Sequence, residues 1–578
     1  MSVTGADRFQ VEVLFDEIAS RHAPEPQIAT SDESIKRRLI LCGIGLAAAF
    51  GLLGIRSIDL ALDTPAPSYD VAQAAAAVKA SRLEDADGRV LALNVPAYGL
   101  AINGREVWDP EEAALGLAAI FPSVDPDKLR VKLSAEQRVV IDRVITDGQR
   151  EAVMALGLPG LSFPPTEQRV YPQGRLFSHV VGYQIPGRGG VTGLEGAATI
   201  RELQGQQTTT LNVTAQTILL SELERAMDRF GAKAAWGILM DAQDGSVAAL
   251  ASLPDFDPNV PGQSPASARR NRLVSDNYEL GSALKALTVA AALEAGVVGL
   301  ETQVDVRSPL VVGDWEIEDY SMKKAVMTVE EVLATSSNIG TGQLALVLGS
   351  ERFVDILSRF GLTERLETAL PEGRTPLLPP RWGEAEVVTA SYGHGIAVSP
   401  LHLTAAFAAT VNGGALIKPR FFADEPVERT PILRPETSAA MRRGLRSVIT
   451  DGTGGNAEAM GYYVIGKTAT ADKPVGGRYF DDGPLLSSFI GAFPGHDPRY
   501  VLLISLDEPQ GTADTYGFAT AGWTAAPAFR RAVERLAPVL GVMPVRQDEA
   551  ADGFLDGQLP PLEAPITQLI MEVDRQAG

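Results

Sequence analysis

Cysteine and histidine are scarce in this chain. Its 578 residues include one cysteine, Cys42, and five histidines. A single cysteine excludes an internal disulfide, and the histidines form no cluster with cysteine at the spacing of a zinc site. We therefore expect neither a structural metal ion nor a bound cofactor.

Positive charge is also in deficit. Lysine and arginine number 51 against 72 aspartates and glutamates, which gives a formal net charge of -21 at pH 7. Nonspecific nucleic-acid binding needs cations that displace counterions from phosphate, so the composition argues against a nucleic-acid partner. A hydrophobic fraction of 45% with 21% charged residues is typical of a globular protein, here long enough for two or more domains.

Apolar runs on the scale of a membrane span are lacking, except for one near the N-terminus. Leu39 to Ile55 is uncharged over about 17 residues, the low end of a bilayer span, and follows Lys36-Arg37-Arg38. We predict a cytoplasmic tail at 1–35 and a single transmembrane helix at 36–56 in the inner membrane. The positive-inside rule then places all later residues in the periplasm.

Two other interpretations of this run are a cleaved signal peptide and a buried helix. The preceding tail is too long and too acidic for the usual start of a signal peptide. Uniform apolarity between flanking cations is also unusual for a helix in a soluble core. A membrane anchor is therefore the favoured interpretation.

The first unit outside the membrane, residues 57–207, has mixed strand and helix patterns. Asp87-Gly88 predicts a hairpin turn between short strands. Residues 110–158 are predicted as helices, including the amphipathic run Glu136 to Leu156.

A tail at 546–578 is acidic and contains proline.

The second unit, residues 208–545, has strand patterns at both ends and helical patterns between them. This arrangement predicts an α+β domain whose central antiparallel sheet is assembled from distant segments and flanked by helices. Helices are expected at 214–229, 329–348, 352–360, 401–412 and 530–540, and strands at 236–241, 246–251, 462–471, 486–493 and 500–506.

The segment Gly281-Ser282-Ala283-Leu284-Lys285 carries a candidate nucleophile and base. Residues three apart share one face of a helix, so the lysine amine can approach the serine hydroxyl. A serine needs a partner that removes its proton, and lysine does so only when burial keeps it neutral. The alternative is a helix start with an exposed lysine, and Ser321-Met322-Lys323-Lys324 also fits Ser-x-x-Lys. The pattern therefore needs supporting motifs.

Two further motifs supply that support. Ser336-Ser337-Asn338 follows a helical pattern, and Lys467-Thr468-Ala469-Thr470 lies in a predicted strand. Ser-x-x-Lys, Ser-x-Asn and Lys-Thr-x in this order are the set used by active-site-serine enzymes that recognise penicillin. Ser275-Asp276-Asn277 also fits Ser-x-Asn, but it precedes Ser282 and is out of order.

With these motifs the chain resembles the class B penicillin-binding proteins, specifically the division-type (FtsI-like) peptidoglycan D,D-transpeptidases. The resemblance extends from Lys36 to about Arg535 and implies an elongated pedestal or dimerisation domain followed by a transpeptidase domain. In the first unit it rests on Asp87 to Ala92, Tyr171-Pro172, Ser178 to Gly182 and Gly189 to Glu195. In the second it rests on Asn271-Arg272, Gly281 to Lys285, Ser336 to Gly340, Tyr392 to Pro400, Asn412 to Gly414, Gly466 to Ala471, Arg499-Tyr500 and Asp507 to Pro509.

The resemblance implies a catalytic role for four residues. Ser282 would attack the penultimate D-Ala carbonyl of a stem peptide ending in D-Ala-D-Ala, release the last D-Ala and form an acyl-enzyme. An amine of a neighbouring peptidoglycan strand would then take the acyl group, which makes a cross-link. Lys285 would be the base, Ser336 a proton shuttle to the leaving amine, and Asn338 a residue that steadies Lys285. β-Lactams would acylate the same serine.

The resemblance also implies the substrate-binding groups. Lys467, Thr468 and Thr470 would hold the terminal carboxylate of the substrate. The backbone N–H groups of Ser282 and Thr470 would form the oxyanion hole, and no metal is implied. A SEDS-family glycosyltransferase and other division proteins are the implied partners in septal wall synthesis.

One position departs from the family pattern, because Ala469 stands where the family usually has glycine. In a strand Ala469 lies on the same side as Lys467, so its methyl group enters a closely packed region. We interpret the change as a tuned or slower site. The alternatives are a catalytically weak or silent penicillin-binding scaffold or sensor of the division machinery, and a D,D-carboxypeptidase.

A β-lactamase and a histidine base are two further alternatives. A β-lactamase would share the three motifs, but the Glu-x-x-Leu-Asn arrangement that supplies a deacylating base in one such class is absent. His394, between two glycines, is interpreted as a structural hydrogen-bonding residue because Lys285 already supplies a base. His179 is likewise interpreted as structural.

Overall fold

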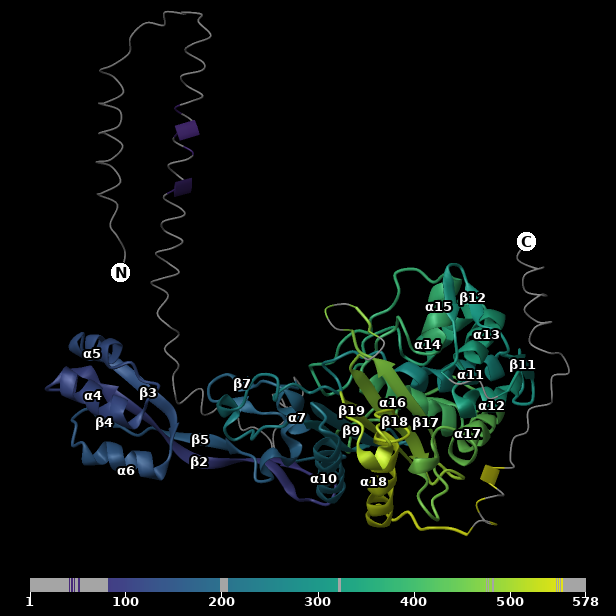
Figure 1. Ribbon diagram of the computed structural model, residues 1–578. Coiled ribbons are helices and arrows are strands. Elements are labelled where there is room, and N and C mark those ends of the chain that lie inside the picture. The colour runs from purple at the N-terminus through teal and green to yellow at the C-terminus, as the bar shows by residue number, and fades with distance from the viewer. Residues whose placement is uncertain are drawn as a thin grey trace, which may run out of the picture. The chain divides into compact units, whose positions relative to one another are not determined.

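The computed structural model describes residues 82–197, 206–320, 324–474, 476, 478–480 and 483–546, with isolated positions within 41–51 and 548–554 (Figure 1). The predicted tail at 1–35, most of the predicted anchor at 36–56 and nearly all of the tail at 546–578 lie outside the described residues. Within the described residues, no helix is both long and apolar enough to cross a bilayer.

A long strand, β2 (Val90–Asn103), organises the first domain. It forms the predicted hairpin with β1 (Arg82–Glu84), where Gly88 adopts a positive φ of 82° and the Asp85 carboxylate accepts from the Arg89 backbone N–H at 2.7 Å. β2 also pairs antiparallel with three further strands, and β1 pairs parallel with a last one. These are β3 (Arg138–Ile145), β4 (Leu161–Ser162), β5 (Pro165–Val170) and, beside β1, β8 (Gln206–Thr208).

Three capped helices cover this sheet. They are α4 (Pro110–Ile120), α5 (Pro126–Ser134) and α6 (Asp147–Ala155). Asp109 and Asp125 cap the first two, each followed by proline, the residue best suited to the first helical position. Their buried faces meet the sheet in a small core that includes Leu100, Leu117 and Val153.

The predicted helix at Glu136 to Leu156 is wrong over its first half, which forms strand β3. β-Branched residues dominate that half and lose side-chain freedom in a helix, whereas the pleated surface beside β2 accommodates them. The helix begins only after Thr146, whose side chain forms a reciprocal capping box with Gln149. The local signal for a helix start therefore lay inside the predicted helix.

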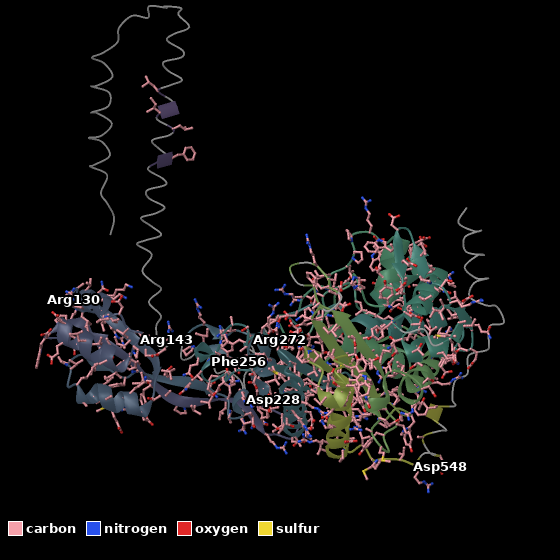
Figure 2. The ribbon with its side chains drawn as sticks, viewed as in Figure 1. Arg130, Arg143, Asp228, Phe256, Arg272 and Asp548 are labelled. Atoms are coloured by element: carbon pink, nitrogen blue, oxygen red, sulfur yellow. The ribbon has the colours of Figure 1, made fainter. Side chains whose placement is uncertain are left out.

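Short elements link the first domain to the second. They are β6 (Gln184–Ile185), β7 (Gly189–Gly190), α7 (Ser178–Val181) and α8 (Gly193–Gly196). His179 in α7 is buried, and its Nε2 lies 2.8 Å from the Ala268 carbonyl oxygen. Its ring packs edge-on against that of Phe256, a residue labelled in Figure 2. These contacts agree with a structural role for His179.

The second domain is built on a five-stranded antiparallel sheet in the order β10-β9-β19-β18-β17. Its strands are β9 (Ala234–Asp241), β10 (Val247–Leu253), β17 (Ile465–Asp472), β18 (Leu485–Phe493) and β19 (Tyr500–Asp507). Because β9 pairs directly with β19, the two ends of the domain meet in the middle of the sheet. The predicted α+β fold with a sheet assembled from distant segments is confirmed.

Helices cover both faces of this sheet (Figure 1). α10 (Val213–Phe230) and α18 (Ala525–Val539) pack on one face in a core that includes Phe489 and Phe529. The other face packs against a larger helical layer that contains α11 (Leu284–Glu294). The rest of that layer comprises α12 (Val329–Thr335), α13 (Asn338–Leu348), α14 (Ser350–Arg359), α15 (Glu384–Ser391), α16 (Pro400–Val411) and α17 (Pro435–Thr450).

Three small two-stranded antiparallel sheets complete the domain. They are β11 (Gln303–Asp305) with β14 (Val326–Thr328), β12 (Leu310–Val312) with β13 (Trp315–Ile317), and β15 (Ala415–Ile417) with β16 (Arg429–Pro431). The helical stretch predicted at 329–348 is two helices, α12 and α13. They are separated at Ser336 and Ser337.

A buried ion cluster joins α10 to α18 and yields a stability prediction. Glu222 is 2% exposed and accepts hydrogen bonds from Arg531 at 2.9 Å and Arg535 at 2.7 Å. Glu222→Ala should lower the free energy of unfolding by about 3 kcal/mol, because it leaves the Arg531 guanidinium buried without a counterion. Arg535→Ala should cost less than about 1 kcal/mol, because that side chain is half exposed.

Denaturant unfolding of the two purified variants and the native protein checks this. Equal losses for Glu222→Ala and Arg535→Ala would contradict the assignment of the burial penalty to Arg531.

Candidate active site

Ser282 lies in a one-turn 3₁₀ helix, Gly281–Ala283, that runs directly into α11. Gly281 has a φ of 49°, and a Cβ there would lie 3.0 Å from the Thr470 carbonyl oxygen of β17. A Cβ on Gly393 would lie 2.1 Å from the Gly281 carbonyl oxygen. Glycine at both positions therefore lets the serine turn fit between the edge strand and the Gly393 loop.

Lys285 projects into the domain and is 1% exposed. Its Nζ donates to Asn338 Oδ1 at 2.7 Å, to Ser336 Oγ at 3.2 Å and to the Ser336 carbonyl oxygen. Burial lowers the pKa of Lys285 from 10.5 to about 7, and the negative charge of Asp319 opposes that shift. The alternative of an exposed lysine at a helix start is thereby excluded.

Ser336 and Asn338 are presented by the break between α12 and α13. Ser336 adopts a left-handed conformation with a φ of 65°, which ends α12. Ser337 then caps α13, its Oγ accepting from the Gly340 backbone N–H at 2.9 Å. This two-residue connection turns Ser336 and Asn338 toward the same amine.

Lys467 lies on the edge strand β17 and is fully buried. Its Nζ donates to the Thr468 carbonyl oxygen at 3.1 Å. Burial, and secondarily the positive charge of Lys285, hold the pKa of Lys467 well below its ordinary value. Gly281, next to Ser282, packs against Thr470 of the same strand, so the structure brings the first and third motifs together.

The two threonines of the third motif have other partners. Thr468 Oγ1 lies 2.6 Å from Thr453 Oγ1, and Thr470 Oγ1 accepts from the Ala521 backbone N–H at 3.0 Å. The sequence analysis missed Thr453 and Ala521, because no local pattern connects either residue to β17.

The Ser282 side chain is not joined to the other predicted catalytic residues by a hydrogen bond among the described residues. Its side chain is partly exposed, and within the described residues its Oγ makes no hydrogen bond to Lys285 or Ser336. Catalytic hydrogen bonds often form only when substrate is bound, and the structure contains no substrate beside Ser282. Of the predicted catalytic group, the structure joins Lys285, Ser336 and Asn338 directly.

Asp319 is a site residue that the sequence analysis missed. Its carboxylate accepts from Ser337 Oγ at 2.6 Å and from the backbone N–H groups of Asn338 and Ile339. It follows β13 and is far from the Ser336 motif in sequence, so no spacing rule points to it.

The competing motif matches have other partners. Asp276 in the earlier Ser-x-Asn match forms an ion pair with Arg270. Lys324 in the second Ser-x-x-Lys match pairs with Glu331 at the protein surface. Neither contact involves Lys285 or Lys467.

His394 lies beside the serine turn but is held by its neighbours. Its Nδ1 is 3.3 Å from Glu279 Oε2, and its ring packs against Tyr479 at a centroid distance of 4.9 Å. Glu279 also accepts from the Gly395 backbone N–H at 2.9 Å. These contacts agree with the interpretation of His394 as a structural residue.

Ala469 is 2% exposed and belongs to the same core as Leu284 and Leu287 of α11. It therefore lies on the face of β17 that carries Lys467, and its methyl group is accommodated by close packing.

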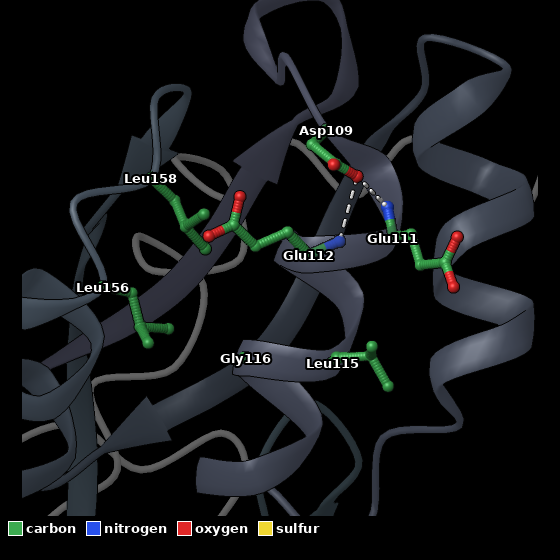
Figure 3. A pocket seen from close by; sticks show the side chains of 7 residues that line it. All are labelled: Asp109, Glu111, Glu112, Leu115, Gly116, Leu156 and Leu158. Carbon is green, nitrogen blue, oxygen red and sulfur yellow. Dashed lines mark hydrogen bonds between the residues drawn. The ribbon is translucent and has the colours of Figure 1, made fainter.

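A hollow of about 510 Å³ lies away from all of these residues, in the first domain (Figure 3). Figure 3 shows Asp109 bonded to the backbone N–H groups of Glu111 and Glu112 as the cap of α4. The hollow is lined by Asp109, Glu111, Glu112, Leu115, Gly116, Leu156 and Leu158. None of these residues belongs to the three motifs. The candidate active site is therefore identified by the contacts among the motif residues and not by this hollow.

Within the part of the chain that the structure describes, no three His, Cys, Asp or Glu side chains gather so as to hold a metal ion.

Two domain families match the chain. The penicillin binding protein transpeptidase domain matches residues 236–533, and the penicillin-binding protein dimerisation domain matches residues 80–195. The chain belongs to the class B penicillin-binding proteins. The two matches lie within the predicted transpeptidase unit at 208–545 and the predicted pedestal at 57–207.

Relatives of this penicillin-binding protein include proteins named as peptidoglycan D,D-transpeptidases. The probable peptidoglycan D,D-transpeptidase FtsI of Caulobacter vibrioides is 36% identical over 477 residues, covering 79% of this chain and 81% of that protein. The peptidoglycan D,D-transpeptidase FtsI of Escherichia coli K12 is 28% identical over 488 residues, covering 77% and 81%.

A solved structure shows the same fold. Penicillin-binding protein 3 of Mycobacterium tuberculosis, complexed with aztreonam, has a TM-score of 0.64 and 24% identity, covering 81% of this chain and 97% of that one.

The packing of Ala469 leads to a prediction. Ala469→Gly should change the acylation rate by a β-lactam by less than about tenfold, or 1.4 kcal/mol, because the methyl group is already accommodated. It should lower the free energy of unfolding by about 1 kcal/mol, because glycine loses more conformational freedom in a strand. Stopped-flow acylation and denaturant unfolding measure the two effects.

Ala471→Gly is the matched control, since Ala471 is on the same strand and faces Gly281. A rise in acylation rate of about a hundredfold in Ala469→Gly alone, about 2.7 kcal/mol, would show instead that the alanine obstructs the site.

Proposed function

We propose that this protein is a serine peptidoglycan D,D-transpeptidase that cross-links stem peptides in septal wall synthesis and is acylated by β-lactams. Relatives aligned over most of the chain carry the name peptidoglycan D,D-transpeptidase. The observation that carries the proposal is the buried amine of Lys285, bonded to Ser336 and Asn338, three residues after Ser282.

In the acylation step, Ser282 Oγ attacks the penultimate D-Ala carbonyl while Lys285 Nζ accepts the hydroxyl proton. A pKa near 7 supports this role, because a large fraction of Lys285 is then neutral at neutral pH. Collapse of the tetrahedral intermediate breaks the amide bond. The proton passes from Lys285 through Ser336 to the departing D-Ala amine, which leaves an ester on Ser282.

The backbone N–H groups of Ser282 and Thr470 stabilise the negative oxygen of the tetrahedral intermediate. Such donors contribute about 3 kcal/mol each to the transition state. Lys467, Thr468 and Thr470 bind the terminal carboxylate of the donor peptide. The amine of a second stem peptide then attacks the ester and gives its proton to Lys285. Lys285 passes that proton to Ser282 Oγ as the ester bond breaks, which restores the free serine.

The chain works at the membrane in this proposal. Residues 36–56 anchor it in the inner membrane, with 1–35 in the cytoplasm and the pedestal and transpeptidase domains in the periplasm. The cations before the apolar run and the charge-free run itself support this topology. A SEDS-family glycosyltransferase, joined by other division proteins, supplies the glycan strands.

A silent penicillin-binding scaffold is the second candidate function. The observation that favours it is Ala469 at the position where the family usually has glycine. A D,D-carboxypeptidase would share the acylation step and differ in its acceptor.

Fluorescent penicillin tests the proposal in membranes that contain the full-length protein. We expect covalent labelling of the native protein and none of Ser282→Ala, because the ester forms on that hydroxyl. Ser321→Ala is the matched control, since Ser321 begins the other Ser-x-x-Lys match, and it should label as the native protein does.

Absence of labelling in the native protein would reject the transpeptidase and favour the scaffold. With a stem-peptide donor, a dimeric product formed with an acceptor amine separates a transpeptidase from a carboxypeptidase, which yields only the trimmed peptide.

A further inference from the structure

Asp319 holds the connection between α12 and α13 from outside those helices. One carboxylate oxygen accepts from Ser337 Oγ at 2.6 Å, and the other accepts from the backbone N–H of Asn338 and, at 3.1 Å, from that of Ile339. Free N–H groups at a helix start favour an anion, so these contacts stabilise α13 where the Ser-x-Asn motif lies.

Glu318, which precedes Asp319, also contacts Asn338. The side-chain amide of Asn338 donates to the Glu318 carbonyl oxygen at 3.0 Å. Its Oδ1 is thereby turned to Lys285 Nζ, 2.7 Å away. The peptide segment Glu318-Asp319 thus fixes both the backbone and the side chain of Asn338.

Asp319 also affects the charge of the buried amine. The Asp319 carboxylate, which follows β13, favours the ammonium form of Lys285. The charge of Lys285 lowers the pKa of the Lys467 amine on β17, and because this repulsion is mutual, a charged Lys467 disfavours the ammonium form of Lys285. Ser336 and Asn338 contact the amine without carrying charge.

We propose that Asp319 is a positioning residue of the acylation reaction, which holds the Ser336–Asn338 connection against Lys285 and supplies the anion that balances its amine. This inference rests on the proposed function. Ser337 already caps α13 from within the chain, so a capping role alone does not require a carboxylate at residue 319. The carboxylate adds charge next to the proposed base.

Charge and position are separated by two substitutions. Asp319→Asn keeps the shape and removes the charge, whereas Asp319→Glu keeps the charge and displaces it. Asp314→Asn is the control, because Asp314 is an exposed acid in the turn of the same hairpin. The measurement is the acylation rate by fluorescent penicillin from about pH 5 to 9, with thermal unfolding of each full-length variant.

Loss of the anion destabilises the ammonium form, so Asp319→Asn should move the acid limb of the pH profile down by about one pH unit. Asp319→Glu should leave that limb in place and lower the plateau rate by about tenfold or more, since the connection is displaced. Asp314→Asn should change neither. The midpoint of the acid limb reflects the titration of Lys285 and Lys467 as a coupled pair. This coupling does not change the direction in which the limb should move.

An acid limb unmoved in a folded Asp319→Asn protein, or a native plateau rate in Asp319→Glu, overturns the inference. If Asp319→Asn does not fold, Asp319→Glu decides alone. These outcomes are distinct from failure of the proposed function, in which the native protein is not labelled at Ser282 at all.

Discussion

Burial of the Lys285 amine is the constraint on which the second domain depends. A fully desolvated ammonium is costly unless it is bonded or gives up its proton. Three acceptor oxygens from Ser336 and Asn338 surround it. Those acceptors require α12 to end in a left-handed residue and α13 to begin two residues later. The break between α12 and α13 thus provides the hydrogen-bond acceptors for the buried Lys285 amine.

The five-stranded sheet places the second amine. Lys467 occupies an edge strand, and the glycines at 281 and 393 allow the serine turn to pack against that strand. Strand alternation puts Lys467 and Ala469 on the side of α11, whereas Thr468 and Thr470 contact Thr453 and Ala521. The serine turn, the Gly393 loop, Thr453 and Ala521 therefore meet at the edge of the sheet formed by β17, although they lie in different parts of the sequence.

The sequence predicts those parts of the fold and of the candidate site that short local patterns define. Ser282, Lys285, Ser336, Asn338 and Lys467 were found because short spacings and their order define a known set. Strand β3 was missed because its amphipathic pattern also fits a helix, and only pairing with β2 decides between them. Asp319 was missed because a tertiary contact made by one carboxylate leaves no pattern in sequence. The break at Ser336 was missed because a left-handed serine has no signature of its own.

The two buried amines have opposite requirements in the proposed mechanism. Lys285 must be neutral to accept a proton, whereas Lys467 must be charged to hold a carboxylate. Burial alone lowers the pKa of both, and their mutual repulsion makes simultaneous charging costly. A substrate carboxylate beside Lys467 would raise the pKa of that amine, and the charge it gains then disfavours the ammonium form of Lys285. In the proposed mechanism, binding of the substrate carboxylate would therefore favour the neutral form of Lys285 through the repulsion between Lys467 and Lys285. In this arrangement Asp319 limits how far the pKa of Lys285 falls, which preserves enough basicity to remove the proton of Ser282.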